Sequence, residues 1–181
     1  TRLLVPENPY PEILDLGLNL SAIGEAEDFL RSTLRDMSRS GSLDPLLVYQ
    51  PSAGILSHRA IAAQWLAKTG IKAHADNVVI TNGGQHGLLL SIMALTTHGD
   101  TIVTESLTYP GARAIAHQLG INLSPVHTDK NGIDPAALRE LCATRKPRAL
   151  YCMPVLQNPT TITMSESRMQ ESAAIVEEFD L

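Results

Sequence analysis

From residue 76 onward, short apolar runs alternate with longer segments in which apolar residues recur every three or four positions. Short runs of this kind predict β-strands, and the longer segments predict amphipathic α-helices. Because the two alternate along the chain, the pattern predicts an α/β fold of three layers, with helices on both faces of a mainly parallel sheet. We expect strands over residues 78–81, 101–105, 121–127 and 148–153, and helices over residues 84–97, 110–119, 135–144 and 166–179.

The preceding residues carry a different pattern, without this alternation. Prolines among polar residues at the very start predict a linker that arrives from an upstream domain. Apolar spacing predicts two helices, over residues 25–38 and 57–68, and we expect the second to turn Ile61, Trp65 and Leu66 inward. The predicted organisation is therefore a linker (1–15), an N-terminal helical segment (16–75) and the first half of a large α/β domain (76–181).

Composition narrows the function classes. Apolar residues make up 44% of the 181 residues and charged residues 18%, which is typical of a globular domain with its own core. The net charge of −5 comes without a basic block, so the chain offers no nucleic-acid surface of its own. No apolar run approaches the roughly 18 residues of a membrane span, so we expect no membrane contact.

Two cysteines, Cys142 and Cys152, lack the spacing and the neighbours of a metal site, so we expect free thiols and no bound metal. Free thiols suit a reducing, cytoplasmic location. The chain begins at Thr1 without an initiator methionine or the apolar core of a signal peptide. We therefore interpret its start as a boundary within a longer protein.

The segment T-N-G-G-Q-H-G, residues 81–87, lies between a predicted strand and a predicted helix. A strand that turns through glycines into a helix leaves free N–H groups at the positive end of the helix dipole, which most often bind a phosphate. Such glycines also serve backbone conformation alone. Neither G-x-G-x-x-G nor the P-loop pattern is present, so dinucleotide and P-loop sites have no support.

Two further loops follow predicted strands. The segment E-S-L-T-Y-P-G places Tyr109 after strand 101–105, and P-V-L-Q-N-P-T-T places Asn158 after strand 148–153. In open α/β sheets, ligands bind outside the carboxyl ends of the strands, where an aromatic side chain stacks on a ring and an amide bonds a ring hydroxyl. The competing interpretation is that Tyr109 packs on a helix and that Asn158-Pro159 only makes a turn. The agreement of three loops favours a ligand site.

Four segments, in this order, resemble the fold-type I pyridoxal-phosphate-dependent aminotransferases of class I/II: Y-Q-P-S-A-G-I-L-S-H-R from Tyr49, T-N-G-G-Q, E-S-L-T-Y-P-G and Q-N-P-T-T. The resemblance covers nearly the whole chain from about Asp15. It is strongest to the aminotransferase-like effector domains of MocR-type regulators in the GntR superfamily. Those regulators join a winged-helix DNA reader to this domain through a linker, which residues 1–15 fit. Thr161, where many enzymes of the class carry glycine, favours the regulator subgroup.

The resemblance implies pyridoxal 5′-phosphate as the cofactor and assigns it a set of contacts. The backbone of Gly84 and Gln85 would hold the phosphate. Tyr109 would stack on the pyridine ring, and Asn158 would hydrogen-bond the phenolic oxygen of that ring. Tyr49 would reach the phosphate of the neighbouring subunit, because sites in this family lie at a homodimer interface.

The resemblance also bears on substrate and activity. Asn19 lies in the family's N-terminal substrate segment and is a candidate near the substrate carboxylate. Transamination needs a Schiff-base lysine, which the family places later in the sequence. We therefore expect no transamination by residues 1–181 alone, and strand edges that oligomerisation or further chain must cover. None of the lysines of this chain ends a predicted strand: Lys68, Lys72, Lys130 and Lys146.

Three functions stay open at this point. The first is part of a regulator's effector domain, which senses pyridoxal phosphate or a small amino compound and reaches DNA only through an upstream winged-helix domain. The second is part of a free-standing class I/II aminotransferase. The third is a cofactor-free binding or scaffold module. A winged helix before Thr1 separates the first two, and the absorption band of a bound cofactor tests the third.

Overall fold

The computed structural model describes residues 25–39, 41 and 43–181, and the chain divides into two compact units, Thr1–Gln50 and Pro51–Leu181. In the first unit, α1 (Ala26–Arg39) is followed by the short 3-10 turn η1 (Asp44–Leu46). The predicted helix over residues 25–38 is thereby confirmed. The predicted linker over residues 1–15 lies outside the described residues.

The second unit contains the alternating strands and helices. Its central sheet has the strand order β2–β1–β5, and both pairings are parallel, as the pattern predicts. The elements, in chain order, are α2 (Leu56–Lys68), η2 (Ala75–Asn77), α3 (Gly84–Leu95), β1 (Thr101–Glu105), α4 (Pro110–Leu119), β2 (Asn122–Val126), β3 (Thr128–Asp129), β4 (Gly132–Ile133), α5 (Pro135–Arg145), β5 (Ala149–Tyr151) and α6 (Glu166–Glu178).

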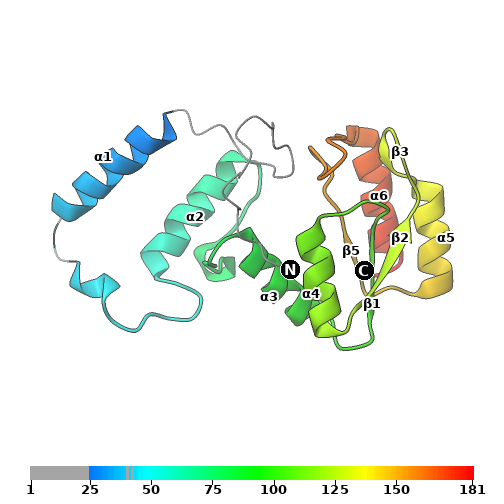
Figure 1. The fold of residues 1–181 in the computed structure, drawn as a ribbon, viewed down its shortest axis with the longest axis horizontal. Helices are drawn as coiled ribbons and strands as arrows, with labels where there is room; N and C mark the ends of the chain where they lie inside the picture. Colours follow the sequence, from blue (N-terminus) through cyan, green and yellow to red (C-terminus); the bar gives the residue numbers. More distant parts are fainter. Residues whose placement is uncertain (1–24, 40, 42) are drawn as a thin grey trace, which may run out of the picture. The chain divides into compact units, whose positions relative to one another are not determined.

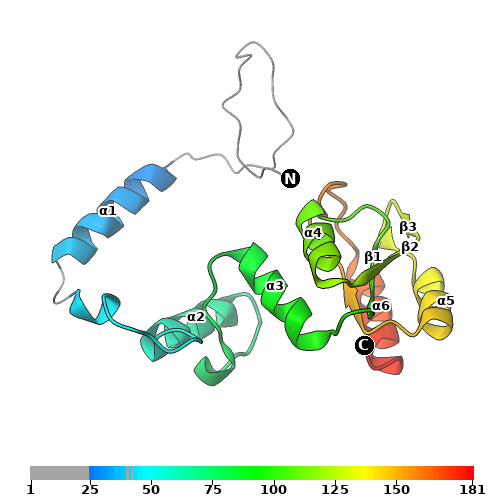
Figure 2. The ribbon, with the colours of Figure 1, turned by 60° about the horizontal axis from the view of Figure 1, so that its bottom comes forward.

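Helices cover both faces of this sheet, and successive residues of β1 show why. Ile102 points into an apolar cluster with residues of α3 and α4, whereas Val103 points into a second cluster with residues of α5 and α6. Side chains alternate between the two faces of a strand, so an apolar strand buries both. Figure 1 shows α4 on one side of the strands and α5 and α6 on the other, and Figure 2 shows α3 next to α4.

The pairing of the strands explains one wrong prediction. Residues 78–81 form no strand in the described part of the chain, although the run V-V-I is apolar. A strand exists through its ladder of backbone hydrogen bonds, and here Ile80 N donates a single bond to Ala53 O at 2.9 Å. The apolar run alone did not reveal that no described strand lies beside it.

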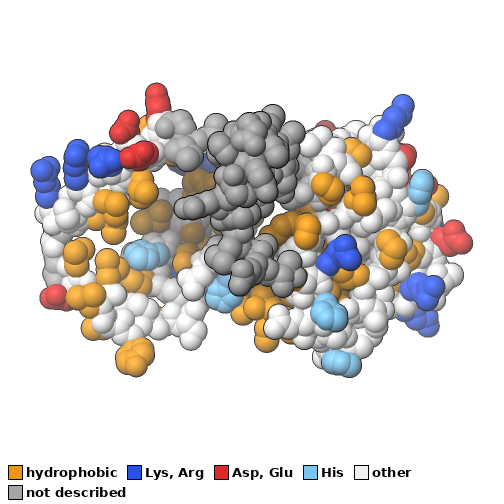
Figure 3. Space-filling model, viewed as in Figure 1, with side chains coloured by type: hydrophobic (Ala, Val, Ile, Leu, Met, Phe, Trp, Pro, Cys, Tyr) orange, Lys and Arg blue, Asp and Glu red, His pale blue; other side chains and the backbone are white. Residues whose placement is uncertain are grey.

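A second correction concerns α2. Ile61 and Trp65 were expected to point inward, but their side chains are 64% and 63% exposed, and Ala63 is the buried residue of this helix. Periodicity identifies an apolar face and says nothing of what covers it. Figure 3 shows hydrophobic side chains at the surface over α1 and α2.

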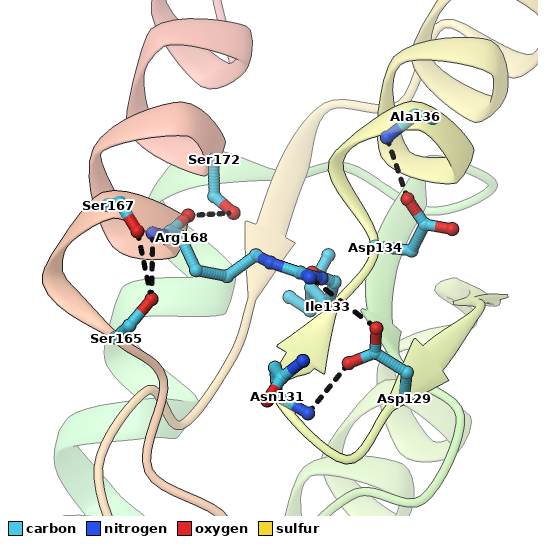
Figure 4. A network of polar contacts seen from close by, with 9 residues as sticks. All are labelled: Asp129, Asn131, Ile133, Asp134, Ala136, Ser165, Ser167, Arg168 and Ser172. Carbon is cyan, nitrogen blue, oxygen red and sulfur yellow. Dashed lines mark hydrogen bonds and ion pairs between the residues drawn. The ribbon is translucent and has the colours of Figure 1, made fainter.

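Arg168 connects α6 to the small antiparallel hairpin β3–β4, which the sequence predicted only as a turn. Its guanidinium donates to Ile133 O at 2.6 Å and to the Asp129 carboxylate at 3.4 Å (Figure 4). The Arg168 side chain is 19% exposed, and its bond to Ile133 O is partly buried, whereas the Asp129 side chain is 39% exposed. The hairpin and α6 are thereby held as one body on the α5–α6 face of the sheet.

Candidate functional site

The N-terminus of α3 is open. The helix begins after Gly83, whose φ of 85° is the left-handed conformation that favours glycine. The hydroxyl of Thr81 donates to Gly83 O at 3.1 Å, and Gly87 N donates to the same carbonyl as the first helical bond. No side chain caps this end, and no described residue accepts from the N–H of Gly84 or Gln85. These N–H groups are free to bind an anion.

Tyr109 lies beside this open end. Gln85 Nε2 donates to Gly111 O at 3.3 Å, which ties α3 to the first turn of α4. A Cβ added at Gly111 would overlap both the Tyr109 ring and the Gln85 side-chain oxygen. The half-buried Tyr109 ring and the start of α3 are therefore neighbours, as the predicted phosphate and ring contacts require.

The loop that carries Asn158 is bonded to the loop that carries Tyr109. Gln157 Nε2 donates to Leu107 O at 2.6 Å and to the Glu105 carboxylate at 3.2 Å. Asn158 follows directly, half-buried, and its peptide bond to the next proline is cis. The segments after β1 and β5 thus meet at the carboxyl edge of the sheet, where a ligand of an open α/β fold binds.

Glu105 ends β1 with its carboxyl buried among these loops, at 3% exposure. Burial raises the pKa of this carboxyl above its ordinary value, and hydrogen bonds from Gln157 and from Met153 N oppose part of that shift. Glu105 and Gln157 stand in the same two motifs as Tyr109 and Asn158, but neither was predicted to have a role. The signal for Glu105 was its place at the end of an apolar strand. A polar residue there is expected to lie at the rim of the sheet, beside the predicted ligand site.

A cavity of about 270 Å³ adjoins the same loops. Its lining includes Glu105, Thr108, Arg113 and Pro159. Thr108 Oγ1 is buried there without a hydrogen-bond partner, the single such side-chain atom among the described residues. A buried hydroxyl that lacks a partner is costly, so this edge has unused polar capacity.

A larger cavity, of about 1030 Å³, lies elsewhere, along β5 and α6. Its lining contains Leu150, Met164 and Val176 and none of the predicted site residues. Its size reflects the open edge of β5, which pairs with β1 and with no other described strand. We therefore locate the candidate site by the chemistry of the rim and not by cavity volume.

Two other predicted site residues have no described place in this unit. Tyr49 belongs to the first compact unit and is fully exposed, and Asn19 lies outside the described residues. The His86 side chain closes the turn before α3, because its Nδ1 accepts from Asn82 N at 3.1 Å.

The described residues contain no group that could hold a metal ion and no disulfide, since both cysteines are free. Burial raises the pKa of Cys152 to about 11. None of the described helices combines the length and the apolar character that a membrane crossing requires.

The chain belongs to the aminotransferase class I and II family, whose model matches residues 11–181. Among curated proteins it is similar to the uncharacterized HTH-type transcriptional regulator YdeF of Bacillus subtilis (strain 168), with 24% identity over 98% of this chain and 38% of YdeF. It is also similar to the aromatic amino acid aminotransferase C569.07 of Schizosaccharomyces pombe, with 29% identity over 82% of this chain and 33% of that protein. The chain therefore spans less than two fifths of the length of these relatives.

Solved structures agree with this family. The crystal structure of an archaeal alanine:glyoxylate aminotransferase matches 86% of this chain with a TM-score of 0.76 and 27% identity, over 39% of that chain. LysN, the α-aminoadipate aminotransferase of Thermus thermophilus, was solved with N-(5′-phosphopyridoxyl)-L-leucine. It matches 87% of this chain with a TM-score of 0.70 and 27% identity, over 38% of LysN. The fold is that of the aminotransferases.

Proposed function

We propose that this chain binds pyridoxal 5′-phosphate, as part of the aminotransferase-like effector domain of a MocR/GntR-type transcriptional regulator. One observation carries the cofactor proposal: the open N-terminus of α3 lies beside Tyr109, and the loop of Asn158 is bonded to the loop of Tyr109. The phosphopyridoxyl group in LysN supports the same cofactor.

The residues present fit this group. A Cβ at Gly84 would meet no atom of the described residues within 4 Å, so these residues leave room for a phosphate beside the start of α3. Gly84 and Gln85 would hold the phosphate through their backbone, Tyr109 would lie against the ring, and Asn158 would donate to the ring's phenolic oxygen. When bound, pyridoxal phosphate supplies an electron sink for reactions of amino compounds. The chain's own contribution is to hold and orient the ring.

Similarity alone admits both the regulator and a free-standing enzyme: YdeF, an HTH-type regulator by its name, is similar over 98% of this chain, and so is an aromatic amino acid aminotransferase of Schizosaccharomyces pombe. One observation favours the regulator. Thr161 stands where many enzymes of the class carry glycine, and its φ of 61° is the left-handed conformation that glycine adopts more easily. In this proposal a small amino compound or the cofactor itself is the effector, and DNA is bound by another domain. The protein is a homodimer, in which Tyr49 serves the partner's phosphate site and Asn19 the substrate carboxylate.

The cofactor proposal is tested by titrating the whole protein that carries this chain with pyridoxal phosphate, pyridoxal and inorganic phosphate. We expect saturable binding of pyridoxal phosphate, far weaker binding of pyridoxal, and competition by inorganic phosphate. Equal binding of pyridoxal and pyridoxal phosphate would contradict a phosphate site at α3. If none of these three compounds binds, the cofactor-free scaffold is the function that remains.

The regulator proposal needs a separate measurement. We expect the whole protein to shift a DNA fragment from its own promoter region, and the affinity to change when pyridoxal phosphate and an amino compound are added. The similarity to an aromatic amino acid aminotransferase makes the enzyme the second candidate. Transamination without DNA binding would favour that enzyme.

A further inference from the structure

Gln157 is a buried amide that uses all of its hydrogen-bonding capacity. Its side chain donates to Glu105 Oε2 at 3.2 Å and to Leu107 O at 2.6 Å. Its Oε1 accepts from Thr160 N at 2.8 Å and from the Thr160 hydroxyl at 2.6 Å. At 4% exposure, an amide is stable only when its donors and acceptors are satisfied, and here they are.

The backbone of Gln157 is held as firmly as its side chain. Its N–H donates to Ile162 O at 2.9 Å, and its carbonyl accepts from Thr161 N at 2.6 Å. Two residues of this loop, Leu156 and Thr161, have φ values of 48° and 61°, a conformation that non-glycine residues adopt at a cost. Such a backbone persists only where its surroundings determine it, and the bonds of Gln157 supply that determination.

Glu105 is the fixed end of this arrangement. It ends β1, the strand that pairs on both sides, and its Oε2 accepts from Gln157 Nε2 and from Met153 N, both at 3.2 Å. One carboxylate oxygen therefore joins the end of the central strand to the segment that follows β5. Because Leu107 lies between Glu105 and Tyr109 in the same loop, the bonds of Gln157 set the separation of the two loops at the rim.

We propose that Gln157 and Glu105 are positioning residues, which hold Asn158 at a fixed place relative to Tyr109 so that both meet the cofactor ring without rearrangement. The inference rests on the proposed cofactor function. A side chain that is already in place loses little freedom on binding, so preorganisation raises affinity without any contact of its own. An ordinary core clamp would change stability alone, whereas a positioning pair acts on affinity through Asn158.

The test is a double-mutant cycle in the whole protein, read by pyridoxal phosphate affinity, by the absorption maximum of the bound cofactor and by the melting temperature. Gln157→Met keeps the volume and removes the hydrogen bonds, and we expect affinity to fall about tenfold with a shifted maximum. In an Asn158→Ala background, the same substitution is expected to lower affinity less than about twofold, because Gln157 acts on the ring only through the Asn158 side chain. Gln118→Met, at an exposed position of α4, is the matched control and leaves affinity and spectrum unchanged.

Glu105 provides the conservative comparison. Glu105→Gln keeps a side-chain oxygen that accepts from Gln157 and Met153, so we expect affinity within about threefold of the unmodified protein, whereas Glu105→Met loses about tenfold. Should Gln157→Met fail to fold, Thr160→Val replaces it. It deletes the hydroxyl bond to Gln157 Oε1 at 2.6 Å and the longer bond from Ile162 N to the same hydroxyl at 3.4 Å, and we expect it to weaken affinity about threefold.

The outcomes separate the two proposals. If the unmodified protein binds no pyridoxal phosphate, both the proposed function and the positioning role are contradicted. If it binds, but Gln157→Met costs the same with and without Asn158, the function stands and the positioning role is overturned. A lower melting temperature with unchanged affinity and spectrum would likewise make Gln157 a structural clamp only.

Discussion

The two pairs of helices on the sheet begin in different ways. α5 and α6 start with side-chain caps: the Asp134 carboxylate accepts from Ala136 N at 2.9 Å, and Ser165 Oγ accepts from Arg168 N at 3.3 Å (Figure 4). α3 and α4 have no side-chain cap, and Tyr109 itself occupies the N-cap position of α4. One face of the sheet therefore satisfies its helix ends internally, and the other leaves them available.

The difference in capping distinguishes a face stabilised within the protein from the face that carries the proposed binding site. A capped helix end gains stability because its free N–H groups are paired within the protein. The face with the capped helices is also cross-linked by the pairs Arg168–Asp129 and Arg139–Glu178. An uncapped end gives up that stability and keeps its positive dipole for a ligand. The following predictions test this contrast, from the largest expected effect to the smallest.

Closing the open end should separate binding from stability. Gly84→Glu places a carboxylate at the first turn of α3, where a Cβ has free space. We expect pyridoxal phosphate affinity to fall roughly 100-fold through like-charge repulsion, while stability rises by about 0.5 kcal/mol through the helix dipole. The neutral Gly84→Gln is the matched control for size. Equal loss of affinity in both variants would show that charge at this end does not matter.

The largest stability effect is expected on the capped side. Arg168→Met removes the bonds to Ile133 O and Asp129 and leaves a buried carbonyl unpaired, which we expect to cost about 2 kcal/mol. Denaturant unfolding measures the change. Arg113→Met, at an exposed position of α4, is the control and should stay within about 0.5 kcal/mol. A similar loss in both variants would contradict a specific role for Arg168.

Removing the caps should cost stability and leave binding alone. For Asp134→Ala and Ser165→Ala we expect a loss of about 1 kcal/mol each, since each leaves a helix N–H without its partner. Ser91→Ala serves as the control inside α3, where the hydroxyl only donates to Gly87 O. Thermal unfolding and cofactor titration are compared in all three variants. A change in pyridoxal phosphate affinity with either cap variant would contradict the contrast between the two faces.

The smallest effect is expected in the loop after Asn158. Thr161→Gly relieves a left-handed φ of 61°, and after the entropy cost of glycine we expect a net gain of about 0.5 kcal/mol. Thr161→Ala shortens the side chain without relieving the backbone and should not stabilise. If both variants stabilise equally, the Thr161 side chain and not its φ is the source of strain.

Local signals decided how much of the fold the sequence could predict. The bounds of α4 were predicted to the residue, because Pro110 favours a helix start and Gly120, with φ of 68°, favours a left-handed end. β1 was predicted equally well from its apolar run. The two-residue strands β3 and β4 were not predicted, since two residues show no periodicity. The prediction of a strand over residues 78–81 was wrong, because strand pairing depends on residues far away in the sequence.

The candidate site divides in the same way. Loop composition pointed to Gly84, Tyr109 and Asn158, whose roles stay predictions. Gln157 stood in the same motif without a role, because the importance of an amide depends on which loop it meets after folding. The hydrogen bond from Gln157 to Leu107 O joins two separate loops, and the local sequence of neither loop indicates it. Sequence patterns therefore indicate what contacts a ligand more readily than what holds those contacts in place.

The strand order β2–β1–β5 also constrains how this unit folds. Among the described strands, β1 comes first in the chain and lies at the centre of the sheet. Its pairing with β2, as at Val103 and Ser124, can therefore form before its pairing with β5, as at Val103 and Leu150. Until α5 and the strand after it have emerged from the ribosome, one edge of β1 stays unsatisfied and prone to mispairing. Because such distant parallel pairing closes large loops, we expect slow folding that depends on the segment after α5.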